Sequence, residues 1–378
     1  MTKIIPGQPA FKAVTLPTEI IQNRHRPQGR CPLCFTSADS MTTLYNTDVR
    51  DFTTFGISAQ AACVVYYDSL DELRRVLADN TFPRPLKHLG AGSNMLFTGN
   101  FEGTILISRI AGCRITDAAP DGSVLVAASA GVVMDDLCRD MAQRGIWGLE
   151  NLSGIPGTVG ASAVQNVGAY GVEAGDHIVQ VDAINAATGE HRVFTHDMMQ
   201  FGYRHSIFKT DAMRDRFIIT DVHFRLTVTP SPRLDYANLR SIVGENPTAS
   251  DMRGAVISIR DTKLPDPAVT GSAGSFFKNP VIPQEHFKRI EAMYHDVRVP
   301  HFIVGDDAVK VPAAWLIDKA GCKTMTEGGA SLWPTQPLVI VNTDGQATSA
   351  DILTLERRII DAVRTRFDIT LHPEVEHI

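Results

Sequence analysis

The sequence predicts an α+β protein of two main units, with a boundary near residue 229. Three observations support this prediction. Apolar runs of strand length alternate with amphipathic helical segments over most of the 378 residues. Two glycine-rich loops, at 90–94 and 148–171, interrupt the alternation in the first unit. The segment "TPSPR" at 229–233 then supplies two prolines between the units.

The first unit begins with a clear strand and helix. "ACVVYY" (62–67) reads as a buried strand, and "SLDELRRVLADN" (69–80) as a helix. Ser69 and Glu72 have the spacing of a capping box, while Leu70, Leu73 and Leu77 share one helical face. A second strand, "LKHL", then leads into the glycine turn "GAGSN".

The remaining elements follow the same two periodicities. "GTILISRI" and "SVLVAASAG" read as strands, and 132–144 as a helix with Val133, Leu137 and Met141 on one face. Asp135 and Asp136 suit its first turn. Further strands are expected in "HIVQVDAINAA", "FIITDVHFRLTV" and "PLVIVN", with helices around "AAWLIDKAG" and over 350–367, where Ile352, Leu355, Ile359 and Val363 form the apolar face.

Composition limits the classes of function. A net charge of −6 with 44% apolar and 21% charged residues describes a soluble globular protein without an electrostatic footprint for nucleic acid. No apolar run has signal-peptide or membrane-spanning length, so we expect no membrane insertion and a cytoplasmic location. We also expect a monomer.

The first 45 residues predict an extension with little structure of its own, because prolines and basic clusters replace periodicity there. This extension contains the pair Cys31 and Cys34 in "CPLC". No second pair or His-x-x-x-His completes a zinc site, so the sequence predicts no metal and two free thiols.

The two glycine-rich loops are the candidate ligand sites. "GAGSN" follows a strand, and its backbone amides could converge on phosphate oxygens. It lacks the third glycine of the Rossmann fingerprint, so an ordinary tight turn is the alternative. The 148–171 segment holds six glycines and one charge, Glu150, and is costly to order without a partner. A loop that binds phosphate and an uncharged loop that binds an aromatic ring are together what a flavin dinucleotide needs. The alternative is a β-rich domain in which both segments are long turns.

Seven motifs in order resemble the UDP-N-acetylenolpyruvoylglucosamine reductase family. They are "GAGSN", "GLENLSGIPGTVGASAVQNVGAYG", "FGYRHSIFK", "KLPDP", "GSAGSFFKNP", "AAWLID" and "LHPEVEHI". The resemblance implies a two-subdomain FAD-binding unit of the vanillyl-alcohol-oxidase (PCMH) type at 46–228 and an α+β substrate domain at 229–378. "PRLDYANLR" resembles the branch with an extra tyrosine-bearing segment.

The implied reaction uses FAD and NADPH to reduce UDP-N-acetylglucosamine enolpyruvate to UDP-N-acetylmuramate for peptidoglycan. The NADPH preference comes from the resemblance alone. Ser275 matches the family's proton donor to carbon, held by Gly271, Gly274, Phe276 and Phe277.

Two further residues match catalytic positions. Arg204 fits the substrate carboxylate, because a guanidinium binds carboxylates in a fixed bidentate geometry. Glu374 matches an acid that hydrogen-bonds the enolate, a role that requires burial to raise its pKa. The ending "EHI" departs from the Arg-Phe-Ile-like ending of many members, and whether Glu376 shares the role of Glu374 stays open.

The resemblance also assigns binding residues. The cofactor positions are Gly90, Ala91, Gly92, Ser93, Asn94, Gly154, Ile155, Gly157 and Gly160. The substrate positions are Tyr236, Arg260, Lys263, Asn279 and Gln336, with Lys263 and Arg260 offsetting the diphosphate charge.

Two other functions compete with the reductase. A flavin-dependent alcohol or lactone oxidase would keep "GAGSN" but has no use for Ser275 or Glu374. A non-catalytic nucleotide-sugar binder would keep Lys263 and Tyr236 and tolerate loss of the acids. The joint presence of all four residues favours the reductase.

Overall fold

The computed structural model describes residues 12–14, 41–236 and 238–378. Its backbone packs into two compact units. Of the described residues, the first unit comprises 12–14, 41–47, 61–91, 102–236 and 238–260, and the second comprises 48–60, 92–101 and 261–378. The predicted division at 228/229 into an FAD-binding and a substrate domain concerns function and stays a prediction.

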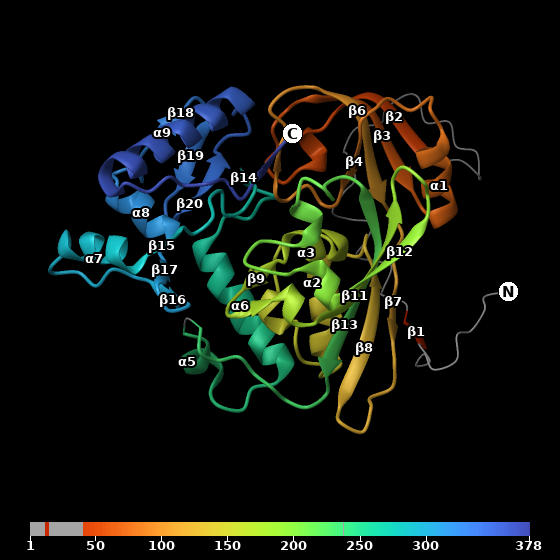
Figure 1. Ribbon diagram of the computed structural model, residues 1–378, viewed down its shortest axis with the longest axis horizontal. Coiled ribbons are helices and arrows are strands. Elements are labelled where there is room, and N and C mark those ends of the chain that lie inside the picture. Colours follow the sequence, from red (N-terminus) through yellow and green to blue (C-terminus); the bar gives the residue numbers. More distant parts are fainter. Residues whose placement is uncertain (1–11, 15–40, 237) are drawn as a thin grey trace. The chain divides into compact units, whose positions relative to one another are not determined.

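The first unit is built on a six-stranded antiparallel sheet (Figure 1). Its order is β1 (Lys12–Val14), β7 (Cys113–Ile115), β8 (Ser123–Ser129), β13 (Phe217–Thr227), β11 (Ile178–Asn185) and β12 (His191–Thr195). Helices α2 (Met134–Gln143) and α3 (Val159–Gln165) bury residues in the core cluster of this sheet. The strands predicted in "SVLVAASAG", "HIVQVDAINAA" and "FIITDVHFRLTV" are confirmed as β8, β11 and β13.

A smaller sheet in the same unit has the order β2-β3-β6-β4. Its strands are β2 (Thr42–Asp48), β3 (Gln60–Tyr67), β6 (Phe101–Ser108) and β4 (Leu86–Leu89), the last two parallel. Helix α1 (Leu70–Ala78) packs its buried Leu73, Val76 and Leu77 against this sheet. The predicted strands "ACVVYY", "LKHL" and "GTILISRI" are thus confirmed, with small shifts at their ends.

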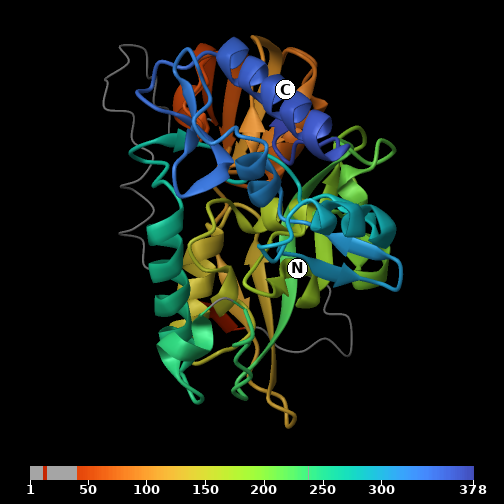
Figure 2. The same ribbon diagram turned by 90° about the vertical axis from the view of Figure 1, so that its left-hand side faces the viewer.

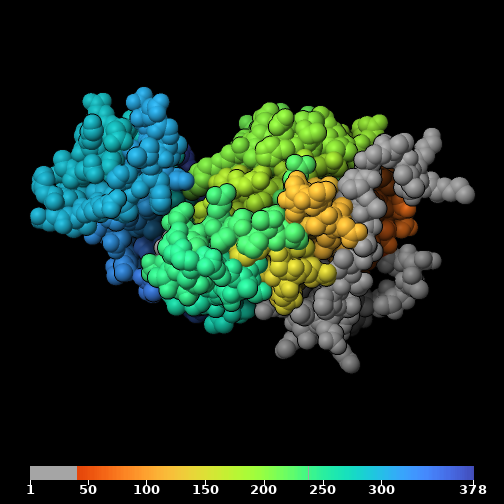
Figure 3. Space-filling view, turned by 90° about the horizontal axis from the view of Figure 1, so that it is seen from below, coloured from red at the N-terminus to blue at the C-terminus, as the bar shows by residue number. Residues whose placement is uncertain are grey.

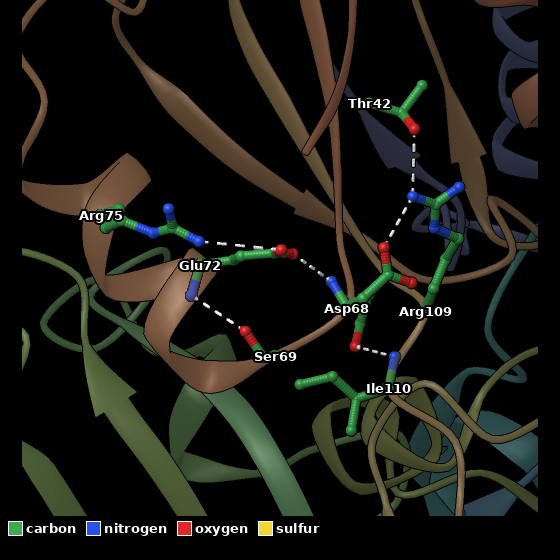
Figure 4. Close-up of polar contacts among 8 residues, drawn as sticks. Thr42, Asp68, Ser69, Glu72, Arg75, Arg109 and Ile110 are labelled. Carbon is green, nitrogen blue, oxygen red and sulfur yellow. Dashed lines mark hydrogen bonds and ion pairs between the residues drawn. The ribbon is translucent and has the colours of Figure 1, made fainter. Parts of the chain in front are cut away.

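The start of α1 differs from the predicted capping box (Figure 4). The Ser69 hydroxyl accepts the Glu72 amide at 3.2 Å, as expected of an N-cap. The Glu72 carboxylate, however, accepts the amide of Asp68 at 2.7 Å and so reaches one residue beyond the cap. Arg109 then joins the Asp68 carboxylate (2.8 Å) to the Thr42 hydroxyl (3.1 Å), which ties β2 to this turn.

Two details of the region around α2 and α3 were not foreseen. Val133 lies at the N-cap of α2 and is 40% exposed, so it does not belong to the buried face that Leu137 and Met141 form. Helix α3 was not predicted, because a helix of small residues has no apolar stripe. Thr158 begins it by accepting the Ala161 amide at 3.4 Å.

Helix α6 (Ala249–Lys263) is the longest helix that packs on the first unit (teal in Figure 2), and the division between the units falls within it. Its buried Met252, Ala255 and Val256 form a separate cluster with Trp147 and Leu239. The other short elements of the unit are α4 (His196–Met199), α5 (Leu239–Val243), β9 (Gly168–Ala169), β10 (Val172–Glu173), η2 (Glu150–Leu152), η3 (Ala174–Asp176) and η4 (Ile207–Lys209).

The second unit has one apolar core beneath a four-stranded sheet, β14 (Gly271–Ser272), β20 (Gln336–Asn342), β19 (Ala330–Trp333) and β18 (Thr326–Glu327). Helices α8 (Ala313–Lys319) and α9 (Ser349–Phe367) pack on it. Ile352, Leu355, Ile359 and Val363 are fully buried, as the sequence predicted for this helix. A second sheet, β15 (Val281–Pro283), β17 (Ala308–Lys310) and β16 (Phe302–Val304), carries α7 (Gln284–Ala292), while η1 (Arg50–Phe52), β5 (Met95–Leu96) and β21 (Glu376–His377) complete the unit.

The N-terminal region holds one unforeseen element. Residues Lys12–Val14 form β1 and pair with β7, although the sequence predicted no strand there. Cys31 and Cys34 lie outside the described residues. Cys63, Cys113, Cys138 and Cys322 are buried free thiols. Within the described ranges, no helix is both long and apolar enough to cross a bilayer.

Candidate active site

The glycine-rich segment 148–171 is held in place by other residues of the first unit. The Gly154 amide donates to the Asp135 carboxylate at 2.6 Å, and Arg253 holds that carboxylate from the other side at 2.9 Å. These bonds help keep the pKa of Asp135 below its usual value although burial opposes them. Gly154 has φ +71°, a conformation that favours glycine. The loop is therefore preformed rather than a flexible connection.

Packing explains two of the predicted cofactor-binding glycines. A Cβ at Gly160 would lie 2.7 Å from the Cβ of Ala130, and the Gly160 amide donates to the Ala130 carbonyl at 2.9 Å. A Cβ at Gly90 would lie 2.8 Å from the Thr158 hydroxyl. Both glycines let α3 approach the preceding strands closely, so each has a reason that does not depend on a ligand. Contact with FAD at Gly90, Ala91, Ile155, Gly157 and Gly160 stays a prediction.

Two buried oxygen atoms in this segment have no hydrogen-bond partner among the described residues. They are Oδ1 of Asn151 and Oγ of Ser153, and both residues are completely buried. A buried polar atom without a partner costs about 1–3 kcal/mol, so a ligand edge that supplies donors would relieve that cost. The segment thus fits the polar edge of a flavin. Sequence reasoning missed both residues, although they lie inside the predicted loop.

Glu150, the one charge of the segment, is also buried. Its carboxylate accepts the Gly148 amide at 2.7 Å, and burial raises its pKa. Because this bond joins residues of the same short turn, it stiffens the entry to the loop. The carboxyl group therefore has a structural partner at the start of the segment.

Arg204 lies in a tight turn. The main chains of Gly202 and His205 pair across this turn, and Arg204 has φ +52°. Its Nη2 donates to the Gly168 carbonyl at 2.9 Å, which orients the guanidinium. A side chain at position 168 would meet Arg204 Nη1 at 3.2 Å, so the glycine leaves room for it. An arginine has further donors that can bind a carboxylate.

Tyr236 and Arg260, two predicted substrate residues of the first unit, both lie near Tyr170. The rings of Tyr170 and Tyr236 meet edge to face at 5.7 Å, and Tyr236 remains 42% exposed. Other residues on either side of it, such as Asp235 and Ile242, are also exposed (green in Figure 3). Arg260 Nε donates to the Gly154 carbonyl at 3.1 Å. Burial raises the pKa of Tyr170, and the charge of Arg260 offsets part of this increase. Sequence reasoning did not single out Tyr170.

Ser275 in the second unit lies between two anchored neighbours. Gly271 pairs with Asn342, and a Cβ there would lie 2.3 Å from the Phe55 carbonyl. Gly274 is exposed with φ +71°, which turns the chain before Ser275. Phe276 and Phe277 are buried, as predicted, and their ring centroids are 5.2 Å apart. Ser275 is half-buried on this fixed backbone.

The tail that carries Glu374 lies beside the Ser275 segment. The Glu374 amide donates to the Phe276 carbonyl at 2.8 Å, and the Lys278 amide donates to the His372 carbonyl at 2.9 Å. An isolated antiparallel bridge joins Phe277 and Pro373. The structure therefore brings together the backbone segments that carry the predicted proton donor and the predicted acid, which are far apart in the sequence.

The last residue of the loop "GAGSN", Asn94, is hydrogen-bonded to the same tail. The Asn94 amide group donates to the Glu374 carbonyl at 3.1 Å, and the Asn94 carbonyl accepts the Glu376 amide at 3.0 Å. Gly92 has φ +59°, and a Cβ there would lie 2.1 Å from the Phe52 carbonyl. Gly92 and Asn94 thus have structural partners within the second unit. Their predicted contacts with FAD, like that of Ser93, are untested.

The remaining substrate candidates have different surroundings. Lys263 ends α6 with an exposed side chain, and its carbonyl accepts the Thr335 hydroxyl at 2.8 Å, one residue before Gln336. Gln336 begins β20 opposite Trp333, whose buried Nε1 has no partner among the described residues. Asn279 Oδ1 accepts the amide of Ala313, the first residue of α8, at 2.9 Å, and the contact of its NH₂ group with a ligand stays a prediction.

Comparisons with known proteins identify the family. Residues 61–195 match an FAD binding domain, and residues 266–378 match the C-terminal domain of UDP-N-acetylenolpyruvoylglucosamine reductase. A protein of that name from Bacteroides fragilis is 44% identical over 86% of this chain and 97% of its own length. Its counterpart from Porphyromonas gingivalis is 42% identical over 86% of this chain and 96% of its own length. The chain belongs to the UDP-N-acetylenolpyruvoylglucosamine reductase family.

A solved structure supports the fold of a UDP-N-acetylenolpyruvoylglucosamine reductase. The crystal structure of the enzyme from Thermus caldophilus has a TM-score of 0.61 at 22% identity and covers 89% of this chain and 98% of that one. The predicted α+β fold with an FAD-binding domain is therefore confirmed. "GAGSN" and 148–171 fall in the FAD-binding match, while Ser275, Asn279, Gln336 and Glu374 fall in the C-terminal match.

No cluster of three or more His, Cys, Asp or Glu side chains suited to a metal ion occurs in the part of the chain that the structure describes. Two acidic side chains of the glycine-rich region have protein partners: Asp135 bonds to Arg253 and to the Gly154 amide, and Glu150 bonds to the Gly148 amide. On the sheet of the first unit, Asp182 contacts His223 at 3.1 Å. We assign no role in the reaction to that pair.

Proposed function

We propose that this protein reduces UDP-N-acetylglucosamine enolpyruvate to UDP-N-acetylmuramate with NADPH, as a step of peptidoglycan synthesis. The observation that carries this proposal is the relation to reductases at 44% identity across nearly their whole length. The bonding of the Glu374 strand to the Ser275 segment supports it, because this chemistry needs both side chains. The chemistry supplied by bound FAD is hydride transfer from NADPH and on to the methylene carbon of the substrate.

Ser275 is the proposed proton donor. Hydride addition to the methylene carbon places negative charge on the carbon next to the carboxylate, and that carbon must then gain one proton. A hydroxyl can protonate a centre of such high basicity when its position is right, so position matters more than acidity. The buried Phe276 and Phe277 hold the backbone that carries this hydroxyl. The product has gained one hydride and one proton across the double bond.

Arg204 and Glu374 are proposed to stabilise the enolate-like charge. Arg204 would bind the substrate carboxylate, since its guanidinium stays charged and its bond to the Gly168 carbonyl fixes its direction. Glu374 would donate from its acid form to the same charge. Its backbone is held by bonds to Phe276 and Asn94, which limits its movement.

Binding of the nucleotide sugar is assigned to the remaining polar residues. Lys263 and Arg260 would offset the charge of the diphosphate, and the Tyr236 hydroxyl would reach the same oxygens. Asn279 and Gln336 would bind through their amide groups. The exposure of Lys263 and Tyr236 is consistent with a ligand that arrives from solvent. We also propose that the protein is a cytoplasmic monomer.

The two competing functions are not favoured. A flavin oxidase or a silent nucleotide-sugar binder would not explain why relatives across 86% of the chain bear the reductase name. The deciding experiment mixes FAD-loaded protein, NADPH and the enolpyruvyl nucleotide sugar without oxygen while flavin absorbance is followed. We expect bleaching by NADPH and rapid recovery when the sugar is added. Recovery with oxygen alone would support the oxidase, and a protein that binds no flavin would contradict the proposal.

A further inference from the structure

The C-terminal tail changes hydrogen-bonding partners at Glu374. Before this residue, the tail bonds to the Ser275 segment through His372 and through the Glu374 amide. After it, the amides of Glu376 and Ile378 donate to the carbonyls of Asn94 (3.0 Å) and Leu96 (2.9 Å). Glu374 therefore lies where one set of backbone bonds ends and the other begins. The bonds of the next few residues therefore help to hold the backbone that carries the Glu374 side chain.

His377 anchors this part of the tail through its side chain. Its Nε2 lies 3.4 Å from Oε2 of Glu356 on α9, and its ring faces that of Phe276 with centroids 6.1 Å apart. Phe276 follows Ser275 directly and donates its amide to the Leu338 carbonyl at 2.9 Å. One imidazole thus touches both the helix and the residue next to the proposed proton donor.

Glu356 is an unusual residue for its position on α9. It shares the buried face with Ile352, Leu355 and Ile359, and its side chain is only 8% exposed. The helix around it is rigid, because Thr348 and Asp351 form a capping box and the apolar face is fully buried. A buried carboxyl group is costly unless it has a polar partner. In this structure His377 is that partner.

The charges around the pair favour a neutral contact. Burial raises the pKa of Glu356 to about 7, with Arg357 acting in the opposite direction, and burial lowers the pKa of His377. Arg358, the next residue of α9, bonds to Glu327 of β18. Glu376 is the residue that precedes His377 in β21 and also carries an ionisable side chain. A protonated Glu356 can donate to a neutral imidazole, so the contact does not need a buried ion pair.

We infer that Glu356 is a positioning residue for the reaction: its contact with His377 fixes the tail against Phe276 and thereby fixes the backbone of Glu374 beside the segment that carries Ser275. The inference rests on the proposed function for its catalytic consequence. The anchoring itself is a property of the second unit and can be measured without any substrate. A residue on a rigid helix that acts through a second side chain is a common way to hold a catalytic group.

The test uses the FAD-loaded protein and two independent readouts. In Glu356→Ala and His377→Phe, we expect amide hydrogen exchange of residues 372–378 to be at least about tenfold faster than in the unchanged protein. Glu356→Gln keeps a polar partner for the imidazole and should retain slow exchange. Glu327→Gln, which removes the partner of the neighbouring Arg358, is the matched control and should leave the tail unaffected.

The second readout separates the two half-reactions. Flavin reduction by NADPH should stay within about twofold in all variants, while reoxidation by the enolpyruvyl sugar should slow about tenfold in Glu356→Ala and His377→Phe, because a misplaced acid costs rate. Unchanged tail exchange in His377→Phe, which leaves the α9 core intact, would overturn the inference even if Glu356→Ala does not fold. Faster tail exchange in a protein that never reduces the sugar would instead overturn the proposed function and leave the anchoring in place.

Discussion

The glycine-rich segment 148–171 and the segment 271–280 use glycine for different purposes. In the first, glycines let α3 pack closely on its neighbours, and the oxygens of Asn151 and Ser153 remain buried without a partner among the described residues. In the second, the backbone is bonded on several sides: Ser272 to Thr54, Phe276 to Leu338 and to Glu374.

The two segments are therefore suited to two different tasks, ligand binding and the positioning of side chains. A segment with unsatisfied buried oxygens can bind a ligand through its own polar atoms, and it gains stability when it does so. A segment whose backbone bonds are already used can act only through its side chains, and it holds them in a fixed place. The comparison predicts that changes in 148–171 affect cofactor binding and folding, whereas changes around 271–280 affect the chemical step.

The largest expected effect is that of Ser275→Ala. Loss of a positioned proton donor should slow flavin reoxidation by the enolpyruvyl sugar about 10²–10⁴-fold, while NADPH still bleaches the flavin at a normal rate. Stopped-flow absorbance without oxygen measures both steps. Near-normal reoxidation would show that Ser275 is not the proton donor. It would also contradict the assignment of the chemical step to the segment 271–280.

Lys263→Ala should have the next largest effect. Removal of a charged partner of the diphosphate should weaken substrate binding by about 1.5–3 kcal/mol, or about 10–100-fold, with little change in flavin reduction. Titration of the sugar against the rate of reoxidation gives the affinity. If flavin reduction suffers more than substrate affinity, Lys263 has been assigned to the wrong ligand.

Gly160→Ala tests the packing explanation of the first segment. The new Cβ would lie 2.7 Å from that of Ala130, a buried neighbour, so we expect a loss of about 1–3 kcal/mol in stability and weaker FAD retention. Thermal unfolding with and without added FAD measures both. Gly254→Ala on the exposed side of α6 is the control, because a Cβ there meets nothing within 4 Å. Unchanged stability in Gly160→Ala would show that the glycine serves only the ligand.

The smallest expected effect concerns pH and the tail. Burial raises the folded-state pKa of Glu356 to about 7, so the folded protein binds the proton more tightly than the unfolded chain does. The protonated Glu356 therefore adds to the free energy of unfolding below the unfolded-state pKa. This stabilisation, about 1–3 kcal/mol, is lost as the pH rises through about 7. Urea unfolding between pH 5 and pH 8, compared with Glu356→Gln, measures this loss. An identical pH dependence in both proteins would contradict it.

Sequence patterns predicted the regular elements well because periodicity is a local property. The apolar face of α9, the strands β3, β8, β11 and β13, and the N-cap at Ser69 can all be read from residues a few positions apart. Helix α3 could not, since its small residues carry no stripe and its formation depends on close packing at Ala130. Asn151 and Ser153 were not predicted as site residues for a related reason. Their oxygens are unusual because they are buried without a hydrogen-bond partner among the described residues, and burial depends on the tertiary structure.

The sequence by itself determined the α+β class, the order of the motifs and the family that they indicate. Only the tertiary structure decided which segments meet: the Glu374 strand against the Phe276 carbonyl, Asn94 against the same strand, and Glu356 against His377. The physical reason is the separation along the chain between the residues that make each contact. Helices and strands follow from contacts between residues close in the chain, whereas a site assembled from distant segments depends on how the whole core packs.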